Sequence, residues 1–257
     1  MKILVLVKQV PDTYEERRLN PATGLVDRDP DQSVADEINE RALEVALRHK
    51  DANKKSEVVV LTMGPTSAKE ALRKALSMGA DAAVHVVDDR LEGADIATTA
   101  TVLAAALHRT GYDLVLAGNE SSDGRGGVVP AMVAEHLGLP LLSSLDTIEF
   151  SEAAVTGNVT VESGTVSVSA ALPAIVSVTE RSAEARFPNF KGIMTAKRKP
   201  LDTLSLADLG LDLGAGAGTS TVRGFYERPA RTAGKKIIDD GTAARELAEF
   251  LVAGRLI

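Results

Sequence analysis

The chain has 257 residues, enough for one sizeable core and an appendage, and 44% of them are apolar and 25% charged, as in ordinary globular proteins. Its formal net charge of −7 argues against a dedicated nucleic-acid binder, because neutralising phosphates requires a positive surface. The absence of cysteine excludes disulfides, thiolate-bound clusters, cysteine zinc sites and thiol catalysis, so any redox chemistry requires a bound organic cofactor.

The sequence shows neither a membrane span nor a metal-binding pattern. No stretch of about 18 consecutive residues is apolar, and the chain opens directly in a strand-like run without a cleavable leader. We therefore expect a cytoplasmic protein that is not embedded in a membrane. The histidines lie far apart in different predicted elements, so we predict no metal site. They are His49, His85, His108 and His136.

The first half of the chain alternates between strand and helix patterns. Short apolar runs predict buried strands at residues 2–7, 57–62, 82–87, 114–117 and near Leu141. Apolar stripes at helical spacing predict helices at residues 31–50, 66–79, 96–107 and 128–137. The connection 8–30 is long for a compact domain, which favours a functional role. Strands separated by such helices predict an α/β fold with a doubly wound, mainly parallel sheet.

The pattern of apolar residues changes near residue 147, from one of alternating strands and helices to one of short strands. Short β-branched segments predict added strands, at least partly antiparallel, at residues 147–150, 158–161, 165–170 and 175–178. Residues 181–200 lack periodicity but carry large apolar side chains, so they either fold back on the core or face a partner. A glycine/alanine linker at 213–220 precedes an extended polar stretch, 221–236, and an amphipathic helix at 242–253. Because an isolated helix of this length is marginal in water, it must dock on something.

The most informative stretch is DLVLAGNESSDGRGGVVP, residues 113–130. A buried strand passes into a loop whose glycines (Gly118, Gly124, Gly126 and Gly127) allow backbone N–H groups to turn inward, and the positive end of the next helix faces the same place. This pattern is typical of a phosphate cradle, although glycine and serine also favour a long solvated turn. The side chains of Asn119, Glu120, Ser121, Ser122 and Asp123 could hold a ribose or an adenine edge.

Ligands of doubly wound sheets bind beyond the carboxyl ends of the strands, where the winding reverses. Three segments are expected there: the one from Val7 onward, residues 63–65, and the glycine loop. The sequence has neither a Walker motif nor GxGxxG, so neither P-loop hydrolysis nor ordinary NAD binding is supported.

Six blocks of sequence point to one family. They are MGPTSAKEALRKALSMGAD (63–81), DLVLAGNESSDGRGGVVP (113–130), LPAIVSVTE (172–180), RFPNFKGIMTAKRK (186–199), DLGLD (208–212) and RTAGKKI (231–237). Together, and in this order over essentially the whole chain, they resemble the beta subunit of electron transfer flavoproteins. The resemblance implies an adenine nucleotide alpha-hydrolase-like fold. It also implies a heterodimer with an alpha subunit, an FAD held mostly by that subunit, and an AMP buried in the beta subunit.

The resemblance further implies an electron carrier of fatty acid β-oxidation with no catalytic residues and no substrate turnover of its own. FAD would take electrons from acyl-CoA and related dehydrogenases and pass them to a membrane quinone oxidoreductase. The implied nucleotide-binding positions are Leu6, Asp36, Glu37, Ile38, Asn39, Met63, Gly118, Asn119, Glu120, Ser121, Ser122, Asp123, Gly124, Arg125, Gly126, Gly127, Val128 and Val129.

Three departures from the family pattern bear on the cofactors. Asp36-Glu37 replaces the common Asn-Pro, which implies an altered adenine or ribose contact. Residues 158–160 lack the charged pair that relatives carry in V-E-R-E, which puts contacts near the flavin in question, and Glu162 is a partial substitute. The loop also lacks the threonine–glutamine pattern (DGDTAQVGP) of members that bifurcate electrons with a second FAD, so AMP is favoured over that alternative.

The family pattern also assigns partner surfaces. Within the nucleotide-binding part, residues 1–220, the segment 182–194 is the expected dehydrogenase-docking loop, with Phe190 as its anchor. Its expected contacts are Arg186, Phe187, Phe190, Ile193 and Met194; alternatively, both phenylalanines cover the hairpin edge as core. Residues 221–257 are the expected arm on the alpha subunit.

Two other function classes share this architecture. An ATP-pyrophosphatase-like enzyme would need an SGGxDS-like loop where this chain has KQVPDT. A nucleotide-binding stress protein would not explain the linker, the terminal helix and the aromatic loop.

Overall fold

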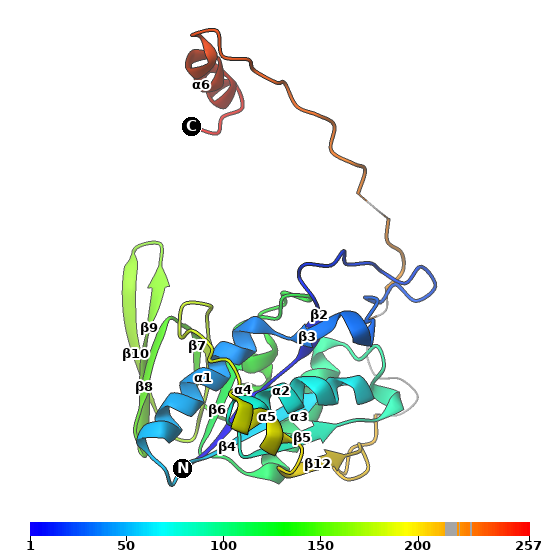
Figure 1. Cartoon of the computed structure of the whole chain (residues 1–257), viewed down its shortest axis with the longest axis vertical. Coiled ribbons are helices and arrows are strands. Elements are labelled where there is room, and N and C mark those ends of the chain that lie inside the picture. The colour runs from blue at the N-terminus through cyan, green and yellow to red at the C-terminus, as the bar shows by residue number, and fades with distance from the viewer. Residues whose placement is uncertain (214–219, 221, 227) are drawn as a thin grey trace. The chain divides into compact units, whose positions relative to one another are not determined.

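The computed structural model describes residues 1–213, 220, 222–226 and 228–257 (Figure 1), so most of the linker predicted at 213–220 lies outside the described residues. Contacts divide the chain into two units, Met1–Arg223 and Gly224–Ile257.

A seven-stranded sheet forms the centre of the first unit, and all of its pairings are parallel. Its strands are β1 (Lys2–Leu6), β4 (Glu57–Met63), β5 (Ala82–Val86), β6 (Leu114–Gly118), β7 (Leu141–Leu145), β11 (Ala174–Val178) and β12 (Leu201–Leu204). Their order is β12-β5-β4-β1-β6-β11-β7. β1 therefore lies in the middle, with β4, β5 and β12 on one side and β6, β11 and β7 on the other, as in a doubly wound sheet.

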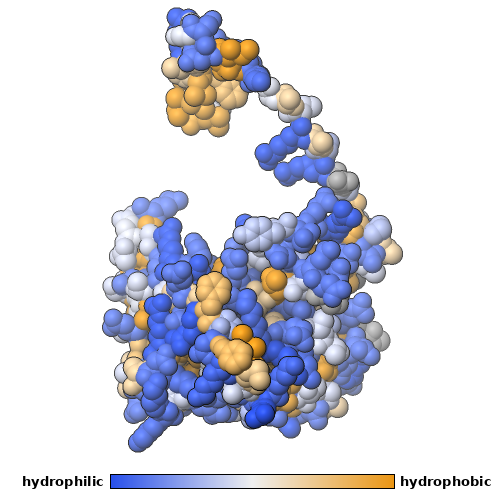
Figure 2. Space-filling model, viewed as in Figure 1, coloured by the Kyte–Doolittle hydropathy of each residue, from blue (hydrophilic) through white to orange (hydrophobic). Residues whose placement is uncertain are grey.

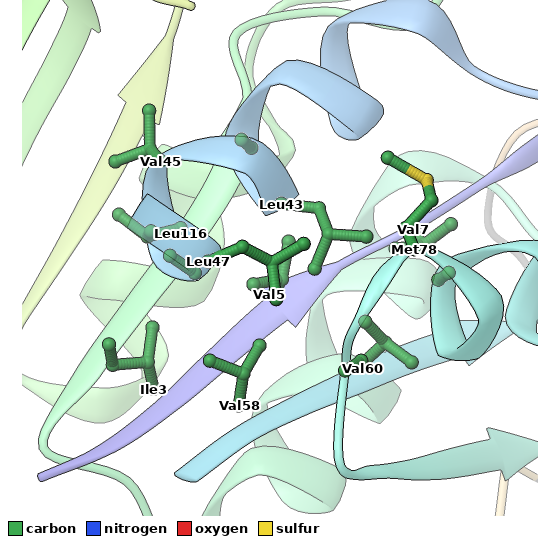
Figure 3. Packing of buried hydrophobic residues seen from close by; sticks show 14 of the residues in the cluster. Ile3, Val5, Val7, Leu43, Val45, Leu47, Val58, Val60, Met78 and Leu116 are labelled. Atoms are coloured by element: carbon green, nitrogen blue, oxygen red, sulfur yellow. The ribbon is translucent and has the colours of Figure 1, made fainter. Parts of the chain in front are cut away.

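Helices cover both faces of this sheet, and alternate residues of β1 point to opposite layers. Ile3, Val5 and Val7 belong to the core cluster that includes α1 (Glu37–Ala52) and α2 (Lys69–Met78). Figure 3 shows Leu43 and Leu47 of α1 packed against this face. Leu4 and Leu6 belong to the opposite cluster, with α3 (Ile96–Thr110) and α4 (Val129–Leu137). The predicted fold class is confirmed.

One of the added strands was misplaced. Residues 175–178 do not join an antiparallel addition, because β11 lies inside the parallel sheet between β6 and β7. Every residue of β11 is buried, which explains the continuous apolar run AIVSV. The antiparallel addition consists of β8 (Thr147–Phe150), β9 (Ala154–Val161) and β10 (Gly164–Ala171), in the order β10-β9-β8. The short edge strand β12 was not predicted.

Two helix predictions also change. The helix expected from residue 31 begins at Glu37, because η1 (Pro30–Gln32) and β3 (Ser33–Ala35) precede it and β3 pairs with β2 (Gln9–Pro11). The segment expected to be irregular contains α5 (Phe190–Ala196). Two further 3-10 turns, η2 (Thr66–Ala68) and η3 (Asp89–Leu91), complete the first unit.

The second unit contains α6 (Ala243–Ala253), close to the bounds predicted for the terminal helix. Across the residues that the structure describes, no helix combines the length and the apolar character needed to cross a membrane.

Candidate functional site

The carboxyl ends of the central strands bring together segments that are far apart in sequence. β1 lies between β4 and β6, so the segments that follow all three strands meet at one edge of the sheet. The Lys8 N–H donates to Asn39 Oδ1 at 2.8 Å, and the Gln9 side chain exchanges hydrogen bonds with Ser67. This is the point where the winding reverses, and such points form the ligand crevice of open α/β sheets.

Gly118 ends β6 against the first turn of α1. A Cβ at this position would lie 2.5 Å from Asn39 Nδ2 and 3.0 Å from Ile38 Cγ2. A larger residue therefore fits only if the side chains of Asn39 and Ile38 shift. The glycine at the strand end therefore permits close contact between the glycine loop and residues 38–39, both of which the family pattern assigns to the nucleotide.

Asp36 fixes the glycine loop to α1. One carboxylate oxygen caps the helix by accepting the N–H groups of Ile38 at 3.0 Å and Asn39 at 3.4 Å. The other oxygen accepts the Ser122 N–H at 2.8 Å. The side chain is buried, and both oxygens are engaged by backbone, so Asp36 supports the loop from within, whereas the neighbouring Glu37 is exposed.

Asp123 is the second internal support, and its partners were missed in the sequence. Its side chain is 1% exposed. Its carboxylate accepts hydrogen bonds from Lys8 Nζ at 2.8 Å and from Arg28 Nη2 at 2.5 Å. Burial raises the pKa of the Asp123 carboxyl, but Lys8, with Ser121 and Arg28, outweighs this effect and holds the pKa well below its usual range. The unusual length of the connection 8–30 was the one signal that pointed to Lys8 and Arg28.

Some polar groups of the loop remain without protein partners. Ser122 Oγ and Asn119 Oδ1 are buried atoms with no hydrogen-bond partner among the described residues. The N-cap of α4, Val128, contributes no side-chain hydrogen bond to the helix start. Buried polar groups ordinarily have partners. The loop therefore combines unpartnered polar atoms with the positive end of a helix.

The backbone of the loop turns sharply before α4. Arg125 and Gly127 have positive φ angles, 48° and 63°, which turn the chain sharply before α4. Residues 124–128 are exposed, and a Cβ on Gly126 would meet Ile96 Cδ1 at 3.2 Å. Leu6 and Met63 end neighbouring strands of the same edge. Most of the predicted nucleotide positions are thus gathered in one region.

The segment predicted for partner docking lies on a different surface, beside α2. Phe187 and Phe190 are 94% and 80% exposed, and Ile193 and Met194 are 55% and 61% exposed. Figure 2 shows orange side chains gathered over α5 with hydrophilic atoms around them. The alternative that the two phenylalanines form core is wrong. Arg186, by contrast, pairs with Glu44 and Asp51 of this chain.

Comparison with known proteins now decides the family. Residues 23–209 match the electron transfer flavoprotein domain. The chain belongs to the electron transfer flavoprotein family. It is 49% identical to electron transfer flavoprotein subunit beta of Mycobacterium leprae and 47% identical to the subunit of the same name from Mycobacterium tuberculosis; each alignment covers 99% of both chains.

More distant relatives also align over nearly the full length. The chain is 34% identical to the caffeyl-CoA reductase-Etf complex subunit CarD of Acetobacterium woodii, over 98% of this chain and 97% of that one. The resemblance of the six sequence blocks to electron transfer flavoprotein beta subunits is therefore confirmed.

Proposed function

We propose that this chain is the beta subunit of a heterodimeric electron transfer flavoprotein that holds AMP in the glycine loop and turns over no substrate of its own. The observation that carries the nucleotide assignment is the pair of buried, unpartnered atoms, Ser122 Oγ and Asn119 Oδ1, beside an uncapped helix start. The N–H groups at the start of α4 suit the phosphate, and the two side chains suit the ribose or adenine. Within the heterodimer, FAD held mostly by the alpha subunit supplies the electron-transfer chemistry.

The residues present fit AMP as a structural ligand. The loop has no Walker lysine, and the ammonium of Lys8 is committed to Asp123 and Ser121. The site therefore offers binding groups without a group placed to activate a water or a leaving group. The relative CarD is a subunit of a caffeyl-CoA reductase-Etf complex, but the loop of this chain lacks the threonine–glutamine pattern associated with a second FAD.

The experiment is nucleotide analysis of the heterodimer purified from cells that express both subunits. Mass analysis after denaturation should find FAD and AMP in equal amounts. Ser122→Ala should lower AMP affinity about tenfold, because it removes one hydrogen bond to the ligand. Ser182→Ala is the matched control, since its hydroxyl donates to Thr179 O outside the loop. Two FAD molecules and no AMP would show the bifurcating type, and ATP hydrolysis would contradict the absence of turnover.

The exposed apolar side chains of the 182–194 segment suit a small, transient contact with electron donors. A carrier must leave each dehydrogenase quickly, and a few buried anchors give specificity without a large interface. We assign Phe190, supported by Phe187, Ile193 and Met194, to docking of acyl-CoA dehydrogenases. The acceptor in this proposal is a membrane quinone oxidoreductase, and the heterodimer itself is cytoplasmic.

The second unit is proposed as an arm that binds the alpha subunit. Within this unit α6 buries none of its residues, and Leu247 and Phe250 are exposed. Lys235 pairs with Glu246 at 2.7 Å, which ties the stretch before α6 to the helix. Truncation after Ser220 should leave AMP bound while FAD retention and alpha-subunit copurification fall. If the truncated chain copurifies with a fully flavinated alpha subunit, the arm assignment is wrong.

A further inference from the structure

Arg186 is held by the chain itself. Its Nε and Nη2 donate to the two carboxylate oxygens of Glu44 at 2.6 and 3.1 Å, and its backbone N–H also donates to Glu44 at 3.3 Å. Its Nη1 lies 2.9 Å from Asp51. A planar guanidinium paired in this bidentate way has a fixed direction as well as a favourable charge. These contacts tie the residue immediately before Phe187 to the outer face of α1.

The acid in this pair is buried and remains ionised. Glu44 is 4% exposed. Burial raises the pKa of Glu44, but hydrogen bonds from Arg186 and Arg48 outweigh that effect and leave the pKa below its ordinary value. A buried carboxylate without its partner is costly. Glu44 therefore holds Arg186 strongly in one arrangement.

Further contacts hold the rest of the segment against α1 and α2. Arg41 Nη1 donates to Ala183 O at 2.5 Å. Lys199 Nζ donates to Leu76 O and Ala80 O, at 2.8 and 2.5 Å, at the end of α2. A Cβ on Gly192 would collide with Ser77 O, so this glycine lets α5 lie directly on α2. Within α5 only Ala196 is buried.

The apolar patch, which comprises Phe187, Phe190, Ile193 and Met194, therefore contributes little to fixing its own position. Its four side chains are exposed, whereas the segment is held by polar contacts from α1 and the end of α2 and by the buried alanines Ala183 and Ala196. A patch fixed before docking loses less conformational entropy when a partner binds.

We infer that the Glu44–Arg186 ion pair positions this patch for docking, and that Arg186 acts through Glu44 without itself contacting the dehydrogenase. This inference rests on the proposed docking function. It reassigns Arg186 from a partner contact to a positioning residue.

A double-mutant cycle on the flavinated heterodimer tests the inference. Arg186→Gln, Glu44→Gln and the double variant are assayed for reduction by an acyl-CoA dehydrogenase, with the carrier as the varied substrate. Each single variant should raise KM by about tenfold and leave kcat unchanged, and the double variant should do no more than either single, because the two residues act as one unit. Arg186→Lys should restore only part of the wild-type KM, since an ammonium cannot form the bidentate contact. Arg181→Gln is the matched control, because its ion pairs in the same region span 3.9 and 4.0 Å.

Hydrogen exchange of the intact heterodimer provides a readout that does not depend on docking. Amides of residues 186–196 should exchange faster in both single variants, while those of β1 and β6 stay protected. A normal KM for Glu44→Gln with a raised KM for Arg186→Gln would overturn the inference, and so would unchanged exchange in both. If Phe190→Ala leaves KM unchanged, the docking proposal fails, and the exchange data still decide whether Glu44 and Arg186 fix the segment.

Discussion

The glycine loop and the 183–199 segment are both held by buried carboxylates, but the groups that they leave without partners differ in polarity. Buried carboxylates hold each of them: Asp36 and Asp123 hold the loop, and Glu44 holds the segment. The loop is left with unpartnered polar atoms at Asn119 and Ser122, whereas the segment is left with exposed apolar side chains. Unpartnered polar atoms in a fixed frame suit a nucleotide, and exposed apolar groups suit a protein surface. The kind of group left without a partner therefore distinguishes the two kinds of site.

The largest expected effect comes from removing the close contact under the glycine loop. Gly118→Ala should lower the free energy of unfolding by about 3 kcal/mol, because its Cβ would overlap the Asn39 side chain at 2.5 Å. Gly124→Ala is the control, since its Cβ would meet Ser121 Oγ and Lys8 Nζ at 3.5 and 3.9 Å. Urea denaturation measures both. Equal midpoints for the two variants would show that the strand end tolerates a side chain.

The next effect comes from the Asp123 support. Asp123→Asn should cost about 2 kcal/mol of unfolding free energy, because Lys8 and Arg28 lose their common partner. The folded-state pKa of Asp123 lies below its ordinary value of 3.8, so its contribution is complete above about pH 4 and is lost as the pH falls toward the folded-state pKa.

Denaturation at a series of pH values checks this sign. The wild type should lose its advantage over the variant as the pH falls below about 4. Glu120→Gln, in the same loop, is the control for a change of net charge. An advantage that stays constant down to the lowest pH would contradict the role of the ionised carboxylate.

The sequence predicted the central fold because that fold is made from local patterns. The runs KILVL and LVLAG and the helical stripes between them identify the parallel strands and their covering helices. The sequence also located the glycine loop, since its four glycines fall within ten residues at the end of a buried strand. It could not reveal that Arg28 meets Asp123 or that Arg186 meets Glu44, because these pairs lie 95 and 142 residues apart. The place of β11 was missed for the same reason, since chain order does not determine where a later strand inserts.

A substitution in the exposed apolar patch should have a small effect on stability and a large effect on electron transfer. Phe190→Ala should change the unfolding free energy by less than about 0.5 kcal/mol, because the side chain is already exposed. Electron transfer from an acyl-CoA dehydrogenase should fall about tenfold with an unchanged flavin spectrum. Tyr14→Ala removes another exposed aromatic side chain, outside the patch, and serves as the control. A large drop in Tm with normal electron transfer would return Phe190 to a packing role.

The smallest structural effect is expected at the tip of the glycine loop. Gly126→Ala should alter the unfolding free energy of the ligand-free chain by less than about 0.5 kcal/mol, because its Cβ would meet only the movable end of Ile96. AMP affinity should nevertheless fall about tenfold, since the added methyl group lies where the phosphate is expected to approach. Isothermal titration with AMP separates the two effects, and unchanged affinity would place the phosphate elsewhere.

The position of β11 also determines when β6 and β7 can be joined during synthesis. β7 pairs with β11, and β11 pairs with β6, so a ribosome that has made residue 145 has not yet made the strand that joins them. The next strands, β8 to β10, pair antiparallel with their sequence neighbours and form a local unit in the meantime. Until β11 emerges, β6 has an open edge next to the glycine loop, and such edges favour wrong pairing in nascent chains. An mRNA truncated between the codons for β10 and β11 therefore yields a chain in which the edge of β6 beside that loop stays unpaired.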